Sequence, residues 1–101
     1  MDKQNFSKRL VELRLNKGVS ARDMSLSIGK NAGYINEVEN CKSFPSINVF
    51  FTICEYLGVT PQEFFDTQTK NPVKSKELLD ATKTLSDEQL DIFITIANEL
   101  K

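Results

Sequence analysis

Apolar side chains recur in the first part of the chain at the three- and four-residue intervals of an α-helix. Phe6, Leu10 and Leu13 stand at positions i, i+4 and i+7, so they would line one face of an amphipathic helix. Gly18 follows as the predicted end of that helix. Nowhere do apolar and polar residues alternate in the way that a strand requires, and no segment is repeated. The pattern therefore predicts an all-helical fold.

Capping residues and glycines divide the next part of the chain into two short helices. Ser20, with Asp23 three residues later, is the predicted start of the first, and Gly29 ends it after about two turns. Asn31 is the predicted cap of the second, which spans about 32–39. The polar residues that follow it indicate a turn.

Two more helices are predicted before the chain becomes polar. The first runs from Pro45 to Gly58 and has apolar residues on most of its sides, which marks it as the most buried helix. Residues 60–63 combine an N-cap threonine, a proline and a glutamate, which is a strong start for a fifth helix. Four phenylalanines of these two helices are expected in the core, namely Phe50, Phe51, Phe64 and Phe65.

The last third of the chain is predicted to hold a linker and one final helix. Residues 69–85 contain Pro72 and are interpreted as a linker, with a weak helix over 76–84. A capping box at residues 86–89 begins the final helix, which occupies 86–101.

The apolar residues of the final helix cover an arc of about 200°, roughly twice the stripe that one neighbouring helix would cover. They are Leu90, Ile92, Phe93, Ile94, Ile96, Ala97 and Leu100. The helix is expected either to dock back on its own domain or to pair also with a second subunit. We favour pairing, which makes 86–101 a dimerisation element and the protein a homodimer.

The net charge of −1 hides an uneven distribution of charges. Residues 1–43 carry eight basic and five acidic side chains, a balance of +3, whereas residues 44–68 carry three acidic side chains and no basic one. A positive face of this kind can meet phosphate groups even when the average charge is close to zero.

Composition argues against several other classes of protein. No run approaches the ~18 apolar residues of a membrane span, and the polar start at residues 1–5 is not that of a signal peptide. Cys41 and Cys54 have no histidine to join them, which argues against a zinc site, and both are expected to be reduced thiols in the cytoplasm. No nucleophile or phosphate-loop motif is present, so we predict no enzymatic activity, no cofactor and no small-molecule substrate.

The order and spacing of the first five helices resemble the Xre/Cro-type family of helix-turn-helix regulators, to which the lambdoid phage repressors belong. The resemblance covers about residues 4–66 and rests on the joint spacing of the following positions. They are Phe6, Leu10, Leu13, Gly18, Ser20, Met24, Ile28, Gly29, Tyr34, Ile35, Val38, Glu39, Lys42, Pro45, Ser46, Leu57, Gly58, Val59 and Phe65. The resemblance implies an all-α, five-helix lambda-repressor-like domain over 1–68. It also implies that this domain binds double-stranded DNA sequence-specifically, as a transcriptional regulator and in particular a repressor.

The resemblance also implies which residues would meet DNA. The helix at about 32–39 would lie in the major groove, with the side opposite its apolar residues facing the bases. That side holds Ala32, Gly33, Asn36 and Glu37, and Lys30 and Asn31 lead into it. Asn36 could pair with adenine, and Glu37 could accept from a cytosine amino group. Candidate backbone contacts are Ser20, Ala21, Arg22, Lys30, Asn40, Lys42 and Ser43.

Two nearby residues of the third predicted helix have competing structural roles. Tyr34 could pack half-buried or touch a base, and packing is favoured. Glu39 is expected to make an ion pair or hydrogen bond within the domain.

The sequence departs from the family pattern at three positions. The family often has glutamine where Ala21 stands and arginine or lysine where Glu37 stands. With the isoelectric point near 5.4, these changes favour an alternative function, a protein-binding module such as an antitoxin-like or partner-docking subunit with weak DNA affinity. The family favours glycine at the position of Cys41, where a left-handed backbone would cost about 1 kcal/mol unless Asn40 makes the turn.

Overall fold

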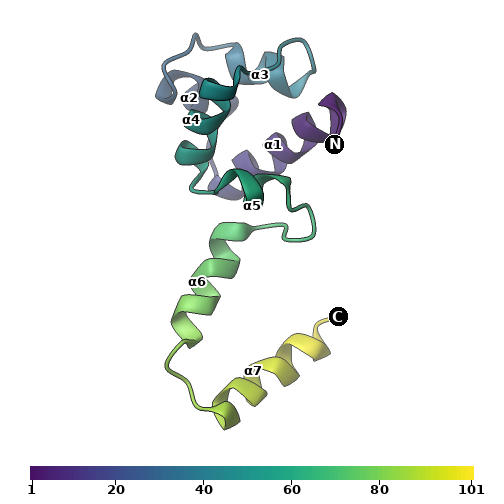
Figure 1. Cartoon of the computed structure of the whole chain (residues 1–101), viewed down its shortest axis with the longest axis vertical. Coiled ribbons are helices and arrows are strands. Elements are labelled where there is room, and N and C mark those ends of the chain that lie inside the picture. The colour runs from purple at the N-terminus through teal and green to yellow at the C-terminus, as the bar shows by residue number, and fades with distance from the viewer.

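The computed structural model describes residues 1–101 and consists of seven helices without a strand, which confirms the all-α prediction. Five helices form a lambda-repressor-like domain, and two more form an arm that leaves it (Figure 1). The helices of the five-helix domain are α1 (Lys3–Lys17), α2 (Ala21–Ser27), α3 (Tyr34–Glu39), α4 (Ile47–Leu57) and α5 (Pro61–Phe65). The C-terminal arm, residues 71–101, contains α6 (Pro72–Thr82) and α7 (Asp87–Glu99).

Several ends of these helices are set by capping residues that the sequence predicts. Ser20 accepts a hydrogen bond on its side chain from the backbone N–H three residues later, and Thr60 and Ser86 each form a complete capping box. Gly18 and Gly58 end α1 and α4 in the left-handed conformation, with φ of 77° and 74°.

The core lies entirely within the five-helix domain and is centred on three phenylalanine rings. The centroid of Phe64 lies 4.9 Å from that of Phe6 and 5.1 Å from that of Phe50, so the rings join α5 to α1 and α4. Phe51 and Phe65 were also expected in the core, but each is about half exposed. Each directly follows a buried phenylalanine, and adjacent helical residues point about 100° apart, so only one of each pair can face inward.

A buried arginine fastens the end of α5 and the following loop to α1. Arg9 donates from Nε to the carbonyl of Phe64 at 2.6 Å, and from Nη2 to those of Glu63, Asp66 and Thr69 at 2.8, 2.9 and 3.0 Å. The last carbonyls of a helix have no partner within the helix, and its C-terminal dipole favours a cation. Arg9 therefore serves as the C-terminal cap of α5, although it lies more than fifty residues earlier in the chain.

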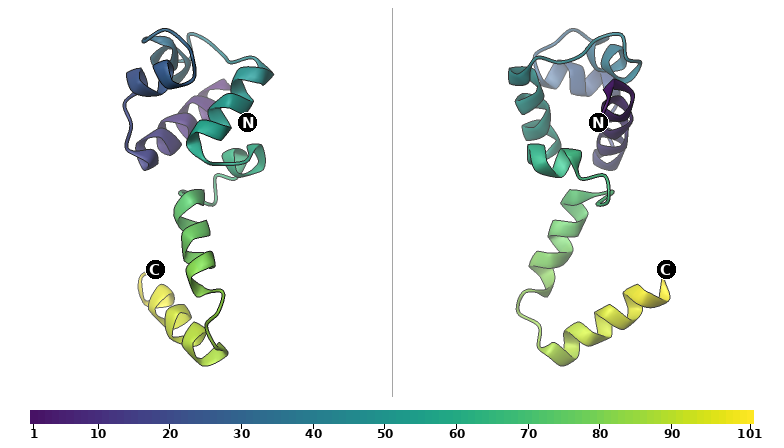
Figure 2. Two further views of the ribbon diagram at one scale, coloured as in Figure 1. Left: turned by 90° about the vertical axis from the view of Figure 1, so that its left-hand side faces the viewer. Right: turned by 45° about the vertical axis from the view of Figure 1, so that its right-hand side comes forward.

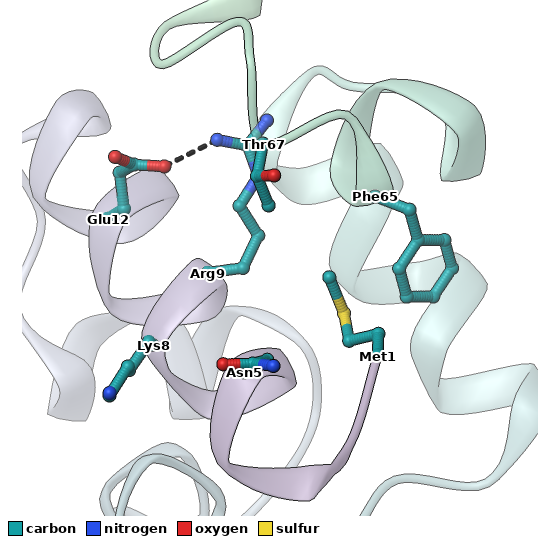
Figure 3. Close-up of a pocket in the computed structure, with 7 residues that line it drawn as sticks. All are labelled: Met1, Asn5, Lys8, Arg9, Glu12, Phe65 and Thr67. Atoms are coloured by element: carbon teal, nitrogen blue, oxygen red, sulfur yellow. Dashed lines mark hydrogen bonds and ion pairs between the residues drawn. The ribbon is translucent and has the colours of Figure 1, made fainter.

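A second residue of α1, close to Arg9, holds the end of the same loop. Figure 3 shows the Arg9 side chain running from α1 toward the segment that carries Thr67, beside a pocket, with its ion pair to Glu12 marked. Asn16, also on α1, donates from Nδ2 to the carbonyl of Lys70 at 2.8 Å. The residue just before the arm is thus held to α1.

The arm begins earlier than the sequence predicts, because α6 includes Pro72. Asn71 accepts a hydrogen bond on Oδ1 from the N–H of Lys74 at 3.1 Å, and Pro72 takes the first helical position. A proline is tolerated there because the first turn leaves its N–H groups without helical partners. The predicted linker over 69–85 is therefore largely helical, and Pro72 begins α6 instead of interrupting a helix.

The arm stands away from the domain. Figure 2 shows α6 and α7 as an open V in both views, and α7 has no buried residue. The radius of gyration is 16.4 Å, against about 13 Å for a compact chain of 100 residues. The expectation that the last helix docks back on its own domain is therefore not met. None of the seven helices combines the length and apolar content that a membrane crossing needs.

The turn after α3 places a non-glycine residue in a left-handed backbone conformation. Cys41 has a φ of 60°, whereas Asn40 has a φ of −95°, so the strained position belongs to the cysteine. Its side chain is exposed, and Sγ lies 3.4 Å from the hydroxyl of Ser7. A side chain with a Cβ is disfavoured in this conformation, and glycine is not.

Cys41→Gly is expected to raise the free energy of unfolding by about 0.5–1 kcal/mol, since relief of the left-handed strain exceeds the added flexibility of the unfolded chain. Urea unfolding followed by circular dichroism measures the change. Cys41→Ala is the control, because it removes the thiol and keeps the strain. An equal gain in both variants would show that the thiol, and not the backbone, limits stability.

Candidate nucleic-acid interface

Helices α2 and α3 pack against each other across the turn at residues 28–33, in the order of a helix-turn-helix. Met24 of α2 and Ile35 and Val38 of α3 are completely buried. The left-handed Gly29, with φ of 80°, and a hydrogen bond from the N–H of Lys30 to the carbonyl of Ser25 shape the turn. The buried sides of both helices are thus fixed, and the opposite side of α3 faces solvent.

The helix α3 begins two residues later than predicted. Ala32 and Gly33 lie in the turn and not in the helix, because Asn31 accepts on Oδ1 from the N–H of Gly33 at 3.2 Å instead of capping a helical turn from 32 onward. The first helical residue is Tyr34. Of the four residues predicted to face the bases, Ala32 and Gly33 therefore lie in the turn between α2 and α3. Asn36 and Glu37 lie in α3 itself.

A buried serine of α2, which the sequence analysis did not single out, holds the start of α3. Gly33 provides no side chain to cap α3, and Ser25 takes over that role by accepting from the N–H of Ile35 at 2.9 Å. The same hydroxyl donates to the carbonyl of Ala21 at 2.7 Å. In the sequence, the sign of this role was a small polar residue next to Met24, on the side of α2 that is buried.

An ion pair holds the other end of α3, as expected for Glu39. Arg14 of α1 meets Glu39 through two hydrogen bonds, Nε to Oε2 at 2.6 Å and Nη2 to Oε1 at 3.0 Å. The pairing raises the pKa of Arg14, chiefly through the hydrogen bond to Glu39. Arg14 also donates to the carbonyl of Val19 at 2.9 Å, so α1, the start of α2 and the end of α3 share one connection.

The exposed side of α3 carries amide and carboxylate groups that are themselves held in place. Asn40 donates from Nδ2 to both the carbonyl and Oδ1 of Asn36, at 2.7 and 3.1 Å. Asn36 is exposed, and no residue of the chain accepts from its amide N–H groups. Glu37 accepts on Oε2 from the hydroxyl of Ser43 at 3.3 Å, and its carbonyl accepts from the N–H of Lys42 at 2.8 Å.

Tyr34 lies at the edge of this exposed side and is half-buried against the core, in agreement with the packing role favoured from the sequence. Burial raises the pKa of its hydroxyl. The ammonium of Lys30 stands 5.3 Å from the centre of the Tyr34 ring, within the range of a cation–π contact. The lysine that leads into α3 is thereby placed beside the start of the helix.

The other predicted contact residues surround α3 and are mostly accessible. Arg22, Lys30 and Lys42 are exposed cations on α2, on the turn and on the segment after α3. Ser20, Asn31 and Asn40 are exposed as well, and Ala21 and Ser43 are partly buried. The structure therefore brings the whole predicted set to α2, α3 and the segments that flank them.

Comparison with known proteins agrees with this geometry. A sequence profile of the helix-turn-helix domain family matches residues 7–69, which is more than half of the chain. Neither a curated protein nor a solved structure matches the chain. The matched range covers α2, α3 and the residues that hold them, from Arg9 to the loop that it caps. The chain therefore belongs to the helix-turn-helix domain family, a family of DNA-binding domains.

Proposed function

We propose that the protein is a sequence-specific transcriptional regulator of the Xre/Cro type, a repressor that reads the major groove of double-stranded DNA with α3. The observation that carries the proposal is the contrast between the two sides of this helix. Its inner side is fixed by Ser25 at one end and by Arg14 at the other, while its outer side presents Asn36 and Glu37 to solvent. A rigid helix with polar groups pointing outward suits direct contact with base edges.

Each residue of the outer surface has a role in this proposal. Asn36 pairs with adenine, and Glu37 accepts from a cytosine amino group. Ala32 and Gly33 lack bulk, so the turn can approach a base pair closely. The surrounding residues contact the phosphate backbone or support those contacts. These are Ser20, Ala21, Arg22, Lys30, Asn31, Tyr34, Asn40, Lys42 and Ser43.

The proposed active form is a homodimer joined through the C-terminal arm. A single α3 can read only a short sequence, whereas a twofold pair reads an inverted repeat with half-sites about 34 Å apart, one turn of DNA. The uncovered apolar residues of α7 provide a surface for pairing.

Selection of bound duplexes from a random pool by the purified protein, at near-physiological salt, tests the proposal. Enrichment of an inverted repeat with half-sites one helical turn apart is the expected result. A folded protein that enriches no sequence would contradict it and would favour a protein-directed role. The exposed Glu37 in the middle of the outer surface is the observation that favours this second candidate, because a carboxylate repels phosphates.

Asn36→Ala is expected to weaken binding to the selected duplex by about 10- to 100-fold, since it removes a two-bond contact to one base. Fluorescence anisotropy with the selected duplex, and with one altered at a single adenine, measures the loss. Lys42→Ala is the comparison, because loss of a phosphate contact should weaken binding to all duplexes alike and reduce the salt slope by about one. Equal weakening on both duplexes by Asn36→Ala would contradict its role in base recognition.

A further inference from the structure

The apolar residues of α7 form two separate seams, which is more than one neighbouring helix can cover. Ile92, Ile96 and Leu100 recur every four residues and form the first seam. Leu90, Ile94 and Ala97 form the second, with Phe93 between the two. The large side chains of these seams and Phe93 are between 48% and 83% exposed, apart from the partly buried Leu90. Helix α7 therefore has room for two helical neighbours, and none of its residues is buried in the single chain.

Helix α6 has a narrower apolar stripe that suits one neighbour. Leu78 and Leu79 are 60% and 65% exposed, and Ser75 and Thr82 lie on the same side of the helix. The remaining large aliphatic side chain, Val73, lies toward the domain, where its Cγ2 would be 3.7 Å from a Cβ placed on Gly58. The stripe of α6 is thus separate from the surface that attaches α6 to the domain.

The net charge of α6, with its C-cap Lys83 included, is opposite in sign to that of α7. Lys74, one turn before Leu78, and Lys83, one turn after Leu79, are each paired on α6 itself, with Glu77 at 3.2 Å and with Asp80 at 3.3 Å. Glu88 and Glu99 flank the first seam of α7. Residues 72–83 carry a net charge of +1, and residues 87–99 carry four acidic side chains and no basic one. The opposite net charges therefore favour packing of an α7 seam on the α6 stripe, which leaves the other seam for another α7.

The connection between the two helices keeps them apart within one chain. The capping box of Ser86 and Gln89 fixes the direction in which α7 starts, and the N–H of Leu85 donates to the carbonyl of Thr82 at 3.2 Å. In Figures 1 and 2 the backbones of the two helices diverge from this turn. Because the ordered turn holds the two apolar faces apart, a helix from outside the chain would be needed to cover them.

We propose that a second copy of the chain covers these faces and that the two arms interlock in a four-helix bundle. The first seam of each α7 packs on the α6 stripe of the partner, and the second seams of the two α7 helices meet on the twofold axis. This assigns one neighbour to each α6 and two to each α7, as the widths of their apolar faces require. The inference rests on the homodimer of the proposed function and names the surfaces that form it.

Disulfide trapping between engineered cysteines tests the exchange of α7. Chains carry Cys41→Ser to remove the exposed thiol, and Cys54 stays because burial raises its pKa to about 11 and keeps it protonated. One chain carries Leu78→Cys and a differently tagged chain carries Ile96→Cys. After mixing and mild air oxidation, the mixed covalent dimer is expected to form about tenfold faster than with Asn98→Cys, which lies on the polar side of α7.

The chain that carries both Leu78→Cys and Ile96→Cys distinguishes exchange from closure. Covalently linked dimers support the inference, whereas a closed monomer would show that α7 folds onto its own α6 and would overturn it. Equal rates for Ile96→Cys and Asn98→Cys would overturn it as well. The experiment contains no DNA, so a trapped dimer that selects no duplex would contradict the proposed function and leave the interlocked arms standing.

Discussion

Arg9→Met is expected to lower the free energy of unfolding by about 3–5 kcal/mol, because it removes a buried charge that satisfies several carbonyl groups at once. The Arg9 side chain is 1% exposed and donates to the carbonyls of Glu63, Phe64, Asp66 and Thr69. Methionine has a similar length and no donor, so these carbonyls would lose their partner while the stem still fills the space. The end of α5 would then separate from α1, and Phe64 would lose part of its burial.

Urea unfolding at several protein concentrations measures this loss independently of association. Lys8→Met is the matched control, since it removes the same charge from the adjacent, exposed position of α1 and should change stability by less than about 0.5 kcal/mol. Arg9→Lys should recover little, because an ammonium group cannot reproduce the fork of the guanidinium. A loss below about 1 kcal/mol in Arg9→Met would mean that water can replace the arginine at these carbonyls.

Ile92→Asp combined with Ile96→Asp is expected to weaken binding to the selected inverted repeat by about 100-fold or more. Two carboxylates in the first seam of α7 would have to be buried against α6 of the partner, so the dimer should dissociate. Each domain would then bind its half-site alone and lose the effective concentration that the linked second domain provides. Affinity for a single half-site should stay unchanged, since α7 has no buried residue and stands apart from the five-helix domain in Figure 1.

Light scattering gives the mass of the variant, and anisotropy titrations compare full operators with half-operators. Asn98→Asp is the control, because it adds a negative charge to the polar side of the same helix and should leave mass and affinity unchanged. A double variant that remains dimeric would place the association surface elsewhere, the exposed Phe51 and Phe65 being the next surface to test.

The order of the helices could be predicted from the sequence because local features determine it. The N-caps Ser20, Thr60 and Ser86 and the terminal glycines act within four residues of their own position, so their effect is visible in the sequence. The start of α3 was predicted too early for a related reason. An asparagine can cap a helix or close a turn, and the sequence around Asn31 does not distinguish these two uses.

The residues that hold the site in place could not be predicted, because their partners are distant in the sequence. Arg9 looks like one more exposed cation of α1 until the carbonyls of residues 63–69 are brought to it. Ser25 likewise gains its role only when α3 packs across α2. The proposed contact residues were identified more readily, since an exposed helix face follows from the periodicity of its buried one.

If the proposed dimer forms, the held start of the arm limits how the spacing of the recognised half-sites can evolve. The carbonyl of Lys70 is held by Asn16, and α6 begins two residues later. In the proposed dimer, this 11-residue helix would set the distance between α3 and the association surface. Each inserted residue would lengthen this helix by about 1.5 Å and rotate the association surface by about 100°. Only insertions or deletions of three or four residues would keep the two halves in phase. Changes in operator spacing would therefore arise in steps of about one helical turn, and intermediate lengths would be selected against.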